Sequence, residues 1–411
     1  MGIPGLLPII KPILVKRHIS SYAGKKIGID GHAWLYQIVP SIAQELFFGL
    51  PTTRHVHILT RKIRSLKSNG IDDIVFVFDG ESLKSKTKTL LERSRKKEAA
   101  RNETMRLLRA NNVTKAREMM QRCVQITSEV MMGVIELLKK EGIEFVISPY
   151  ESDAQLTYLQ RIGHIDYILT EDSDLILYGS TNILYKYDLS HVHEYQRERL
   201  AGAWNSFFAE NIVDICILSG CDYLDGLDGV GIKTACKLLE KHSSVEKVVE
   251  AWRARAGVPE NFLEEFERAK MTFKHQVVFD PINKKRVFLS DIPDKGTRPD
   301  FLGSFIEDEE RFSRGHHLLR KDTMDFFVAE TKRTKKATEH PAETKRSANA
   351  RTARIEGDIV LTALAERPGQ RLANGQHIAK LQSGRASQNQ SIVSSCSDRD
   401  NCYSSSSSVK L

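Results

Sequence analysis

Four short runs of hydrophobic residues in the first half of the chain have the length of β-strands. Each run is continuous rather than alternating, which is typical of strands that are buried on both faces. They span Lys26–Asp30, Ile74–Asp79, Glu144–Ile147 and Tyr167–Leu169. Amphipathic segments lie between them, at Ile58–Leu66, Thr127–Lys140 and Ser152–Arg161. Strands that alternate with helices predict an α/β fold in which helices flank a mostly parallel central sheet.

The connection from Asp79 to Glu144 is too long for a simple crossover between strands. Its pattern predicts one or two helices, Leu90–Ala110 and Val113–Arg122, inserted over one edge of the sheet. From Lys84 to Arg122 the chain carries 13 Lys or Arg residues against 4 Asp or Glu residues. Long insertions of this kind tend to be functional.

After Tyr187 the pattern turns helical. It predicts a helix at Asn211–Leu218, a glycine-rich turn at Gly220–Gly231 and a second helix at Ile232–His242. Further helical residues follow to about residue 277, and a strand is expected at Arg286–Leu289.

The composition fits an intracellular protein with a real core. The chain has 411 residues, 41% of them hydrophobic, which allows two or three domains. No apolar run reaches the roughly 18–20 residues of a membrane span, and the N-terminus lacks the hydrophobic region of a signal peptide. The six cysteines form no CxxC pair or zinc spacing, so we expect reduced thiols.

The charge is unevenly distributed. The net charge is +8, yet the segment 84–122 carries +9 and the segment 331–411 carries +7, which leaves −8 on the remainder. A basic strip and tail on an acidic body suit a protein that binds a polyanion and holds metal cations. The alternative is a solvated helix face followed by a disordered tail.

Acidic residues end or follow each predicted strand. Parallel strands deliver these residues to one edge of a sheet, where ligands bind. Together with one residue after the helix at 211–218, the set is Asp30, Asp79, Glu151, Asp153, Asp172, Asp174 and Asp222. One such residue is usually a helix cap or a turn former, but seven in this arrangement favour a shared site. Glu171 alternates with Asp172 and Asp174, so we expect it to point the opposite way.

So many converging carboxylates raise one another's pKa unless cations are bound. Hard divalent ions with oxygen ligands, Mg²⁺ or Mn²⁺, suit a site that contains no His or Cys. Two such ions about 3.5–4 Å apart form a clamp for in-line attack on a phosphodiester. The pattern therefore predicts a two-metal phosphodiester hydrolase.

Several motifs resemble the flap-endonuclease superfamily, and more narrowly its exonuclease 1 branch. They are the opening Met-Gly-Ile-x-Gly-Leu-Leu, Val-Phe-Asp-Gly at 77–80, Pro-Tyr-Glu-Ser-Asp-Ala-Gln at 149–155, Thr-Glu-Asp-Ser-Asp-Leu at 170–175 and Leu-Ser-Gly-Cys-Asp-Tyr-Leu at 218–224. The resemblance covers roughly residues 1–300. Tyr150 before Glu151, and Ser-Gly-Cys before Asp222, favour the exonuclease 1 branch.

The resemblance implies a Mg²⁺-dependent 5′→3′ exonuclease on double-stranded DNA that also cleaves 5′ flaps. It implies a PIN-like core, a helical arch at 84–122 and a helix–two-turn–helix at about 210–242. The arch follows an N-terminal nuclease region at 1–99; an internal region at 123–235, a helical part at 243–330 and a disordered tail at 331–411 complete the chain. A dedicated flap endonuclease or junction resolvase is the alternative within the class, and a non-catalytic DNA-binding scaffold is the alternative outside it.

The seven carboxylates match the family's metal ligands, with Asp174 also assigned a catalytic role. Lys86 and Arg93 stand where the family places two arch cations that hold the scissile phosphate, and Arg95 is the fallback for Arg93. Lys86 and Arg93 are seven residues apart, two turns along one helix face, so both can point at one phosphate.

The glycine-rich turn matches the family's DNA-binding turn, through Gly229, Gly231 and Lys233. Free N–H groups at the start of the following helix suit phosphate oxygens. The resemblance also implies a K⁺ ion at Ser219, Gly226 and Val230. A purely structural turn remains the alternative.

His32 and Tyr36 exchange the residue types that the exonuclease branch usually has at these places. His32 can still stack on a base, and Tyr36 can still donate to a phosphate. Core packing of Tyr36 is the alternative, and Trp34 is assigned to the core.

The expected partners are double-stranded DNA with 5′ ends, nicks, gaps or flaps, and mismatch-repair proteins or a sliding clamp through the tail. We expect a nuclear monomer with no membrane association. Thr323–Phe327 faintly resembles a clamp-binding peptide but fits a packed helix end better, and Lys332–Lys336 is a nuclear address, a DNA contact or a solubilising run. A short helix is also expected at Ile355–Leu364.

Overall fold

The computed structural model describes residues 2–254, 257–292 and 299–305. The predictions for the tail at 331–411, and those for Thr323–Phe327, Lys332–Lys336 and Ile355–Leu364, lie outside the described residues.

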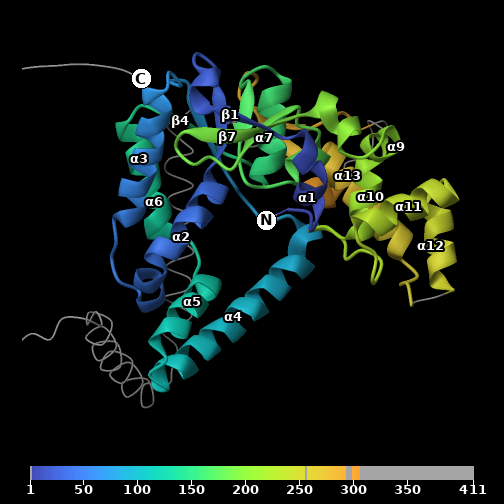
Figure 1. Cartoon of the computed structure of the whole chain (residues 1–411), viewed down its shortest axis with the longest axis horizontal. Coiled ribbons are helices and arrows are strands. Elements are labelled where there is room, and N and C mark those ends of the chain that lie inside the picture. Colours follow the sequence, from blue (N-terminus) through green and yellow to red (C-terminus); the bar gives the residue numbers. More distant parts are fainter. Residues whose placement is uncertain (1, 255–256, 293–298, 306–411) are drawn as a thin grey trace, which may run out of the picture. The chain divides into compact units, whose positions relative to one another are not determined.

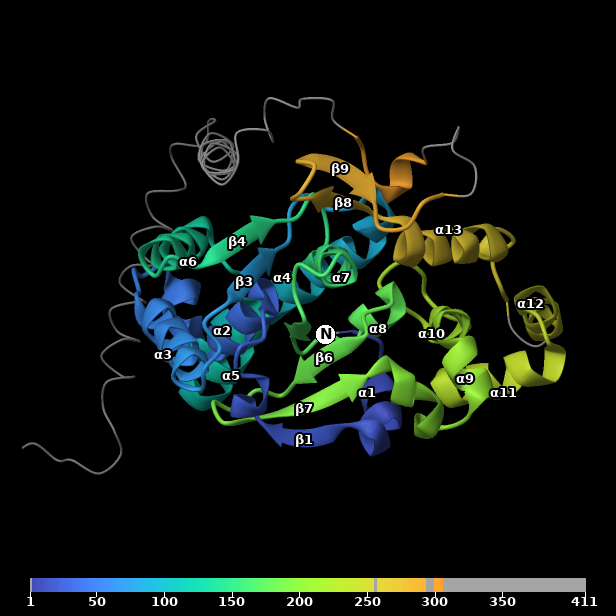
Figure 2. The same cartoon turned by 90° about the horizontal axis from the view of Figure 1, so that it is seen from above.

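A seven-stranded sheet lies at the centre of the described part (Figure 2). Its strands are β1 Val15–His18, β2 Ile27–Asp30, β3 Ile74–Phe78, β4 Glu144–Ile147, β5 Tyr167–Leu169, β6 Asn182–Tyr185 and β7 His191–Gln196. They lie in the order β1-β7-β6-β5-β2-β3-β4. The strands from β6 to β4 pair in parallel, and only the pairs that β7 makes with β6 and β1 are antiparallel. The predicted mostly parallel α/β sheet is thus confirmed.

The helical prediction after Tyr187 is wrong for β7, and the sequence signal also misses β1 and β6. Within β7 only Val192, Glu194 and Tyr195 are buried, so no continuous apolar run marks the strand. The buried Glu194 accepts a 2.9 Å hydrogen bond from Arg17 on β1. A strand stabilised by pairing on both sides and by a distant ion pair cannot be identified from local hydrophobicity.

Helices cover both faces of the sheet. The α-helices are α1 Leu6–Ile10, α2 Gly31–Phe48, α3 Arg54–Ser68, α4 Thr87–Arg109, α5 Val113–Cys123, α6 Ser128–Lys140, α7 Ser152–Arg161, α8 Leu175–Tyr178, α9 Ser206–Glu210, α10 Ile212–Ser219, α11 Ile232–His242, α12 Val245–Arg253 and α13 Phe262–His275. Short 3₁₀ helices span Lys11–Ile13, Ile19–Tyr22, Lys84–Lys86, Arg197–Ala203 and Asp300–Leu302. The predicted helices at 58–66, 127–140, 152–161, 211–218 and 232–242 are all present.

The alternation of side chains along β3 explains the two layers. Val75 and Val77 belong to one core with α1, α7, α10 and α13, whereas Ile74, Phe76 and Phe78 belong to a second core with α2, α3 and α6. Because successive strand residues point to opposite faces, a wholly apolar strand needs helices on both. Figure 2 shows these two groups of helices on either side of the sheet.

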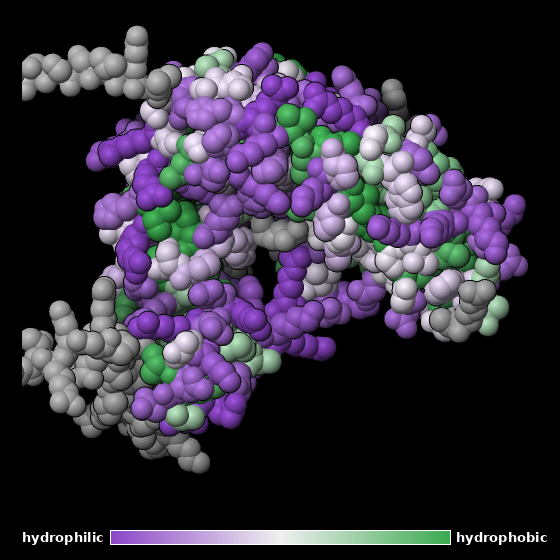
Figure 3. Space-filling view, in the orientation of Figure 1, coloured by the Kyte–Doolittle hydropathy of each residue, from purple (hydrophilic) through white to green (hydrophobic). Residues whose placement is uncertain are grey.

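The basic insertion forms two helices, α4 and α5, as the sequence predicts. A separate small core holds them to α2, through Ala100, Met120 and Cys123 against Val39 and Phe47. Arg101 lies over the ring of Phe47, with 4.9 Å from its guanidinium carbon to the ring centre. The space-filling view shows an opening between the mostly hydrophilic α4 and the body of the protein (Figures 1 and 3).

The remaining helices lie beyond the β6 side of the sheet, and the chain then forms an antiparallel hairpin, β8 Val277–Asp280 and β9 Lys285–Phe288. The strand predicted at Arg286–Leu289 corresponds to β9, whereas β8 has no counterpart in the sequence prediction. Among the described helices, none combines the length and hydrophobicity needed to cross a membrane.

Replacing Leu156 with alanine should lower the free energy of unfolding by about 2–5 kcal/mol, because the side chain is fully buried between α7 and β2. The matched change Leu91→Ala should alter it by less than about 0.5 kcal/mol, because Leu91 on α4 is 56% exposed. Urea titrations of both variants check this difference. Equal losses would contradict the assigned core.

Candidate metal centre

The carboxyl ends of the parallel strands place six acidic residues at one edge of the sheet. Asp30 ends β2, Asp79 follows β3, Glu151 and Asp153 begin α7 after β4, and Asp172 and Asp174 follow β5. One oxygen from each of Asp153, Asp172 and Asp174 lies within 4.8 Å of the other two. The structure therefore brings together residues that are 19 and 21 positions apart in the sequence.

Asp30 is fixed from two sides. Its Oδ1 accepts a 2.9 Å hydrogen bond from the Ala33 N–H and so caps α2, and its Oδ2 accepts a 2.8 Å bond from the Thr170 hydroxyl. Burial, followed by the neighbouring Asp79 carboxylate, raises the pKa of Asp30 to about 7. A carboxyl group in this state needs a nearby cation to be fully ionised at neutral pH.

Gly80 allows the loop after β3 to approach the loop after β4. Its N–H donates to the Tyr150 carbonyl at 2.7 Å, and a Cβ at this position would lie 1.9 Å from the Ser148 carbonyl oxygen. The same approach lets Asp79 Oδ1 accept a 2.8 Å bond from the Ser152 N–H at the start of α7. Glycine after Asp79 is thus required for this juxtaposition.

Two carboxylate oxygens in the cluster are suited to a cation. Oδ1 of Asp153 and Oδ1 of Asp174 are buried and make no hydrogen bond within the described residues. Burial, and then the charge of Asp172, raises the pKa of both groups well above the usual value. Buried oxygens without hydrogen-bond donors, in a set made only of carboxylates, match the coordination preference of a hard divalent ion.

Lys86 and Arg93 lie directly beside the carboxylates. The Lys86 ammonium lies 2.5 Å from Glu151 Oε2 and 2.9 Å from Asp222 Oδ2, and Arg93 donates to both oxygens of Asp222 at 2.6 and 2.9 Å. Although burial opposes it, the charges of Glu151 and Asp222 raise the pKa of Lys86 above its usual value. The base of α4 is therefore bound to the acidic cluster, with Asp222 at the contact.

The other predicted residues differ in their surroundings. Arg95 is exposed two positions beyond Arg93. His32 accepts a 3.0 Å hydrogen bond from the Asp79 N–H, and the 42% exposure of Tyr36 rules out its core packing. Trp34 is 1% exposed, which confirms its place in the core.

Glu171 points away from the cluster, as its alternation with Asp172 predicts. Its Oε1 accepts a 2.9 Å hydrogen bond from the Lys186 N–H, and the buried Lys62 lies on the same side. Glu171 is therefore an acidic neighbour that does not contribute to the candidate centre.

The glycine-rich segment between α10 and α11 is closely packed. A Cβ on Gly226 would lie 2.4 Å from Ser219, and the Leu227 N–H donates to the Leu218 carbonyl at 2.9 Å. Val230 is buried and follows by one residue Gly229, whose φ is +72°. Gly231 precedes α11, which has no side-chain cap, and Lys233 is exposed.

Sequence patterns did not reveal the contribution of the N-terminus and two hydroxyls. The Ile3 N–H donates to Ser173 Oγ at 2.9 Å, and a Cβ on Gly2 would lie 2.6 Å from Asp172 Oδ1. Thr170 also donates to Asp30. A glycine at position 2 is a weak signal on its own, because its partners are about 170 residues away in the sequence.

Two family models match the chain, the XPG N-terminal domain over residues 1–100 and the XPG I-region over residues 142–222. Exonuclease 1 of Arabidopsis thaliana is 37% identical over 314 residues, which cover 74% of this chain and 42% of that protein. The DNA damage-inducible protein DIN7 of Saccharomyces cerevisiae is 31% identical over 303 residues, which cover 71% of this chain and 70% of that protein.

The fold has a solved counterpart. The catalytic core of Rad2 in complex with a DNA substrate superposes with a TM-score of 0.52 at 19% identity, covering 80% of this chain and 99% of the Rad2 chain. This likeness supports the fold, and the sequence matches support the family. The chain belongs to the flap-endonuclease superfamily, within its exonuclease 1 branch.

Proposed function

We propose that this protein is a 5′→3′ double-stranded DNA exonuclease that also cleaves 5′ flaps, and that it hydrolyses phosphodiester bonds with divalent metal ions. One observation carries the proposal. Carboxylates with unpartnered buried oxygens, at Asp153 and Asp174, lie beside two cations, Lys86 and Arg93, at the base of a basic helix. This combination suits a phosphate held between metal ions and cationic side chains.

The proposed metal is Mg²⁺, with Mn²⁺ as a substitute. Asp153, Asp172 and Asp174 would hold one ion, and the remaining carboxylates, Asp30, Asp79, Glu151 and Asp222, would complete a two-ion centre. When bound, such ions activate water and stabilise the leaving oxygen of a phosphodiester. The relatives it matches best are longer than this chain, which spans 42% of the plant exonuclease 1, so activity and substrates are inferred for this chain from its own residues.

Lys86 and Arg93 are proposed to neutralise the scissile phosphate. Both cations are within hydrogen-bond distance of Asp222, so one phosphate at this position would contact both. The seven-residue spacing places them two turns apart on the same side of the segment. Their present carboxylate partners orient them toward the cluster.

The DNA path is proposed from the basic helix and the turn before α11. The 5′ end would enter by the opening beside α4, and the duplex would lie on Gly229, Gly231 and Lys233, with a K⁺ ion at Ser219, Gly226 and Val230 as part of that contact. The close approach of Gly226 to Ser219 supports the last assignment. His32 and Tyr36 would contact the unpaired nucleotides, since Tyr36 is exposed at the site.

The cellular role follows from the same reasoning. We propose nuclear DNA repair, including mismatch repair, end resection and recombination. DNA with 5′ ends, nicks, gaps or flaps would be the substrate, and the tail at 331–411 would contact mismatch-repair proteins or a sliding clamp. The protein would act as a monomer, with 84–122 as the arch over the entering strand.

On a duplex labelled at one end, cleavage should require Mg²⁺ and shorten each strand from its 5′ end. Asp174→Ala should abolish cleavage and retain duplex binding, because a metal ligand is lost while the basic strip remains. A denaturing gel with a 5′-labelled and a 3′-labelled duplex, with and without Mg²⁺, checks polarity and metal need together.

Glu171→Gln is the matched control, since it removes a neighbouring charge that faces Lys186 rather than the cluster. Its cleavage rate should remain near that of the wild type. Unchanged cleavage by Asp174→Ala would contradict the metal assignment. A much faster rate on a 5′ flap than on a blunt recessed duplex would indicate a dedicated flap endonuclease instead.

Lys86→Ala and Arg93→Ala should each lower the rate at saturating substrate by about 10²–10³-fold, because a cation at the developing charge of the transition state is lost. Arg95→Ala removes an equal charge from an exposed position and should cost less than about tenfold. Single-turnover kinetics separate these cases. Equal losses in Arg93→Ala and Arg95→Ala would place the phosphate elsewhere along α4.

Without metal, the cluster should destabilise the fold as pH rises. A carboxyl group whose folded pKa is raised binds more protons in the folded than in the unfolded state, so its stability contribution falls between the unfolded pKa, about 4, and the folded one, about 7 for Asp30. In EDTA, Asp174→Asn should therefore become more stable than the wild type by about 1 kcal/mol or more as pH rises from about 5 to about 8.

Saturating Mg²⁺ should reverse this order, because the ion binds only the folded protein and binds the wild type better. Urea titrations at each pH, with EDTA or Mg²⁺, measure the difference. A wild type that stays more stable than Asp174→Asn at every pH in EDTA would contradict the repulsive cluster.

A further inference from the structure

A chain of buried hydrogen bonds lies behind the candidate metal centre. The hydroxyls of Tyr178 and Tyr223 are hydrogen-bonded to each other, and the Tyr178 hydroxyl donates to Gln276 Oε1 at 3.2 Å. With its own proton given to Gln276, Tyr178 accepts the proton of Tyr223. Gln276 is completely buried and Tyr178 is 4% exposed, so water does not compete for these groups.

The two tyrosines belong to the segments that carry two of the site carboxylates. Tyr178 is the last residue of α8, four positions after Asp174, and Tyr223 directly follows Asp222. These segments are separated by more than 40 residues, and the charge of Asp222 raises the pKa of Asp174. Two repelling carboxylates on separate segments need a tie that holds their backbones together.

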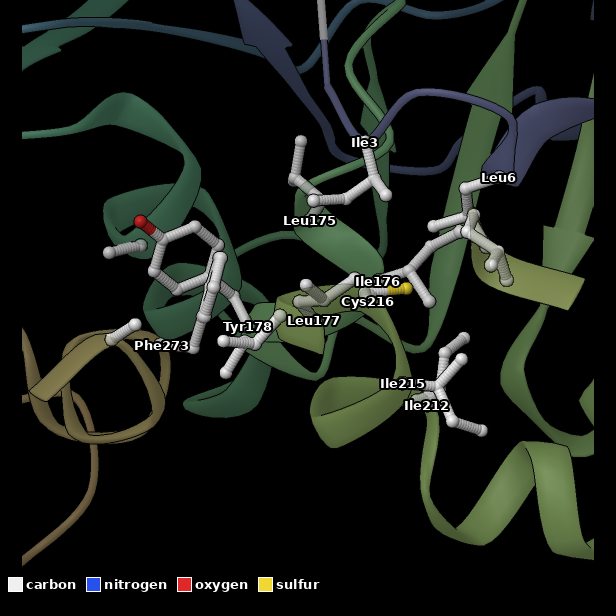
Figure 4. Close-up of a cluster of buried hydrophobic side chains, with 14 of the residues drawn as sticks. Ile3, Leu6, Leu175, Ile176, Leu177, Tyr178, Ile212, Ile215, Cys216 and Phe273 are labelled. Atoms are coloured by element: carbon white, nitrogen blue, oxygen red, sulfur yellow. The ribbon is translucent and has the colours of Figure 1, made fainter. Parts of the chain in front are cut away.

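The tie is packed against one helix. The rings of Tyr178 and Tyr223 both meet the Phe273 ring of α13 edge-on, with centres 5.1 and 5.0 Å away. Figure 4 shows Tyr178 of α8 beside Phe273, at the end of the hydrophobic cluster that contains Leu175 and Ile176. An apolar environment strengthens a satisfied hydrogen bond and makes an unsatisfied one costly.

The segment after α13 also fixes the helix that carries Asp153. Both amide atoms of Gln155 bond to the backbone of Phe279, the Nε2 to its carbonyl and the Oε1 to its N–H, each at 2.7 Å. Gln155 lies two residues after Asp153 on α7. Gln276 and Phe279 thus connect one short stretch of chain to α7, to α8 and, through Tyr178, to the segment of Asp222.

We propose that the hydrogen-bond chain from Tyr223 through Tyr178 to Gln276 is a positioning device that sets the separation of Asp174 and Asp222 and thereby the affinity of the centre for divalent metal. The proposal rests on the proposed function, since it assumes that these carboxylates hold metal. Neither tyrosine touches a reacting atom, and both act through the aspartates beside them.

Tyr178→Phe and Tyr223→Phe remove only the hydroxyl and keep the ring on Phe273. Each should weaken Mn²⁺ binding to the DNA-free protein by about three- to tenfold, the value of one buried hydrogen bond. The double variant should lose little more than either single variant, because both changes break the same chain. Electron paramagnetic resonance of free Mn²⁺ measures the binding directly.

Tyr195→Phe is the matched control. Tyr195 is fully buried, yet its hydroxyl makes no hydrogen bond within the described part of the chain, so its removal should leave Mn²⁺ binding unchanged. In the two test variants, cleavage should recover toward the wild-type rate as metal is raised, with duplex affinity unchanged.

Wild-type Mn²⁺ affinity in Tyr178→Phe and Tyr223→Phe would overturn the proposal, including the case in which their melting temperatures fall. Weakened Mn²⁺ binding in a protein whose wild type cleaves no DNA would support the positioning role and reject the nuclease function. The metal readout therefore separates the two failures.

Discussion

Mutual repulsion among buried carboxylates is the constraint on which the rest of this structure depends. Burial and neighbouring charges raise the pKa values of Asp30, Asp153 and Asp174. An arrangement that is unfavourable for folding persists where its charge is used, and here a divalent ion would convert the repulsion into attraction. The surrounding fold can be understood as the means of keeping these groups close.

Three kinds of contact hold them. Backbone N–H groups and a hydroxyl donate to the carboxylates, as Ala33 and Thr170 do for Asp30. A glycine permits close loops, as Gly80 does between β3 and β4. Cations neutralise the periphery, as Lys86 does for Glu151. Each contact is modest alone, but together they fix positions that the charges oppose.

The base of α4 combines two roles in one element. Its cations are bound to the acidic cluster, whereas the rest of the helix is exposed and basic, and its far end packs with α5 on α2 through a separate core. A polyanion that follows the basic surface would arrive where Lys86 and Arg93 meet Asp222. Substrate recruitment and phosphate contact therefore lie on one continuous segment.

The sequence by itself determined the parallel strands, the two insertion helices and the identity of the seven carboxylates, because continuous apolar runs and residues at strand ends are local features. It also placed Trp34 in the core and Glu171 outside the cluster. Only the tertiary structure decided β7, whose pairing with β1 and β6 replaces local hydrophobicity, and the contact of Tyr178 with Tyr223. Hydrogen bonds between residues far apart in the chain depend on how layers pack, and no local pattern encodes that packing.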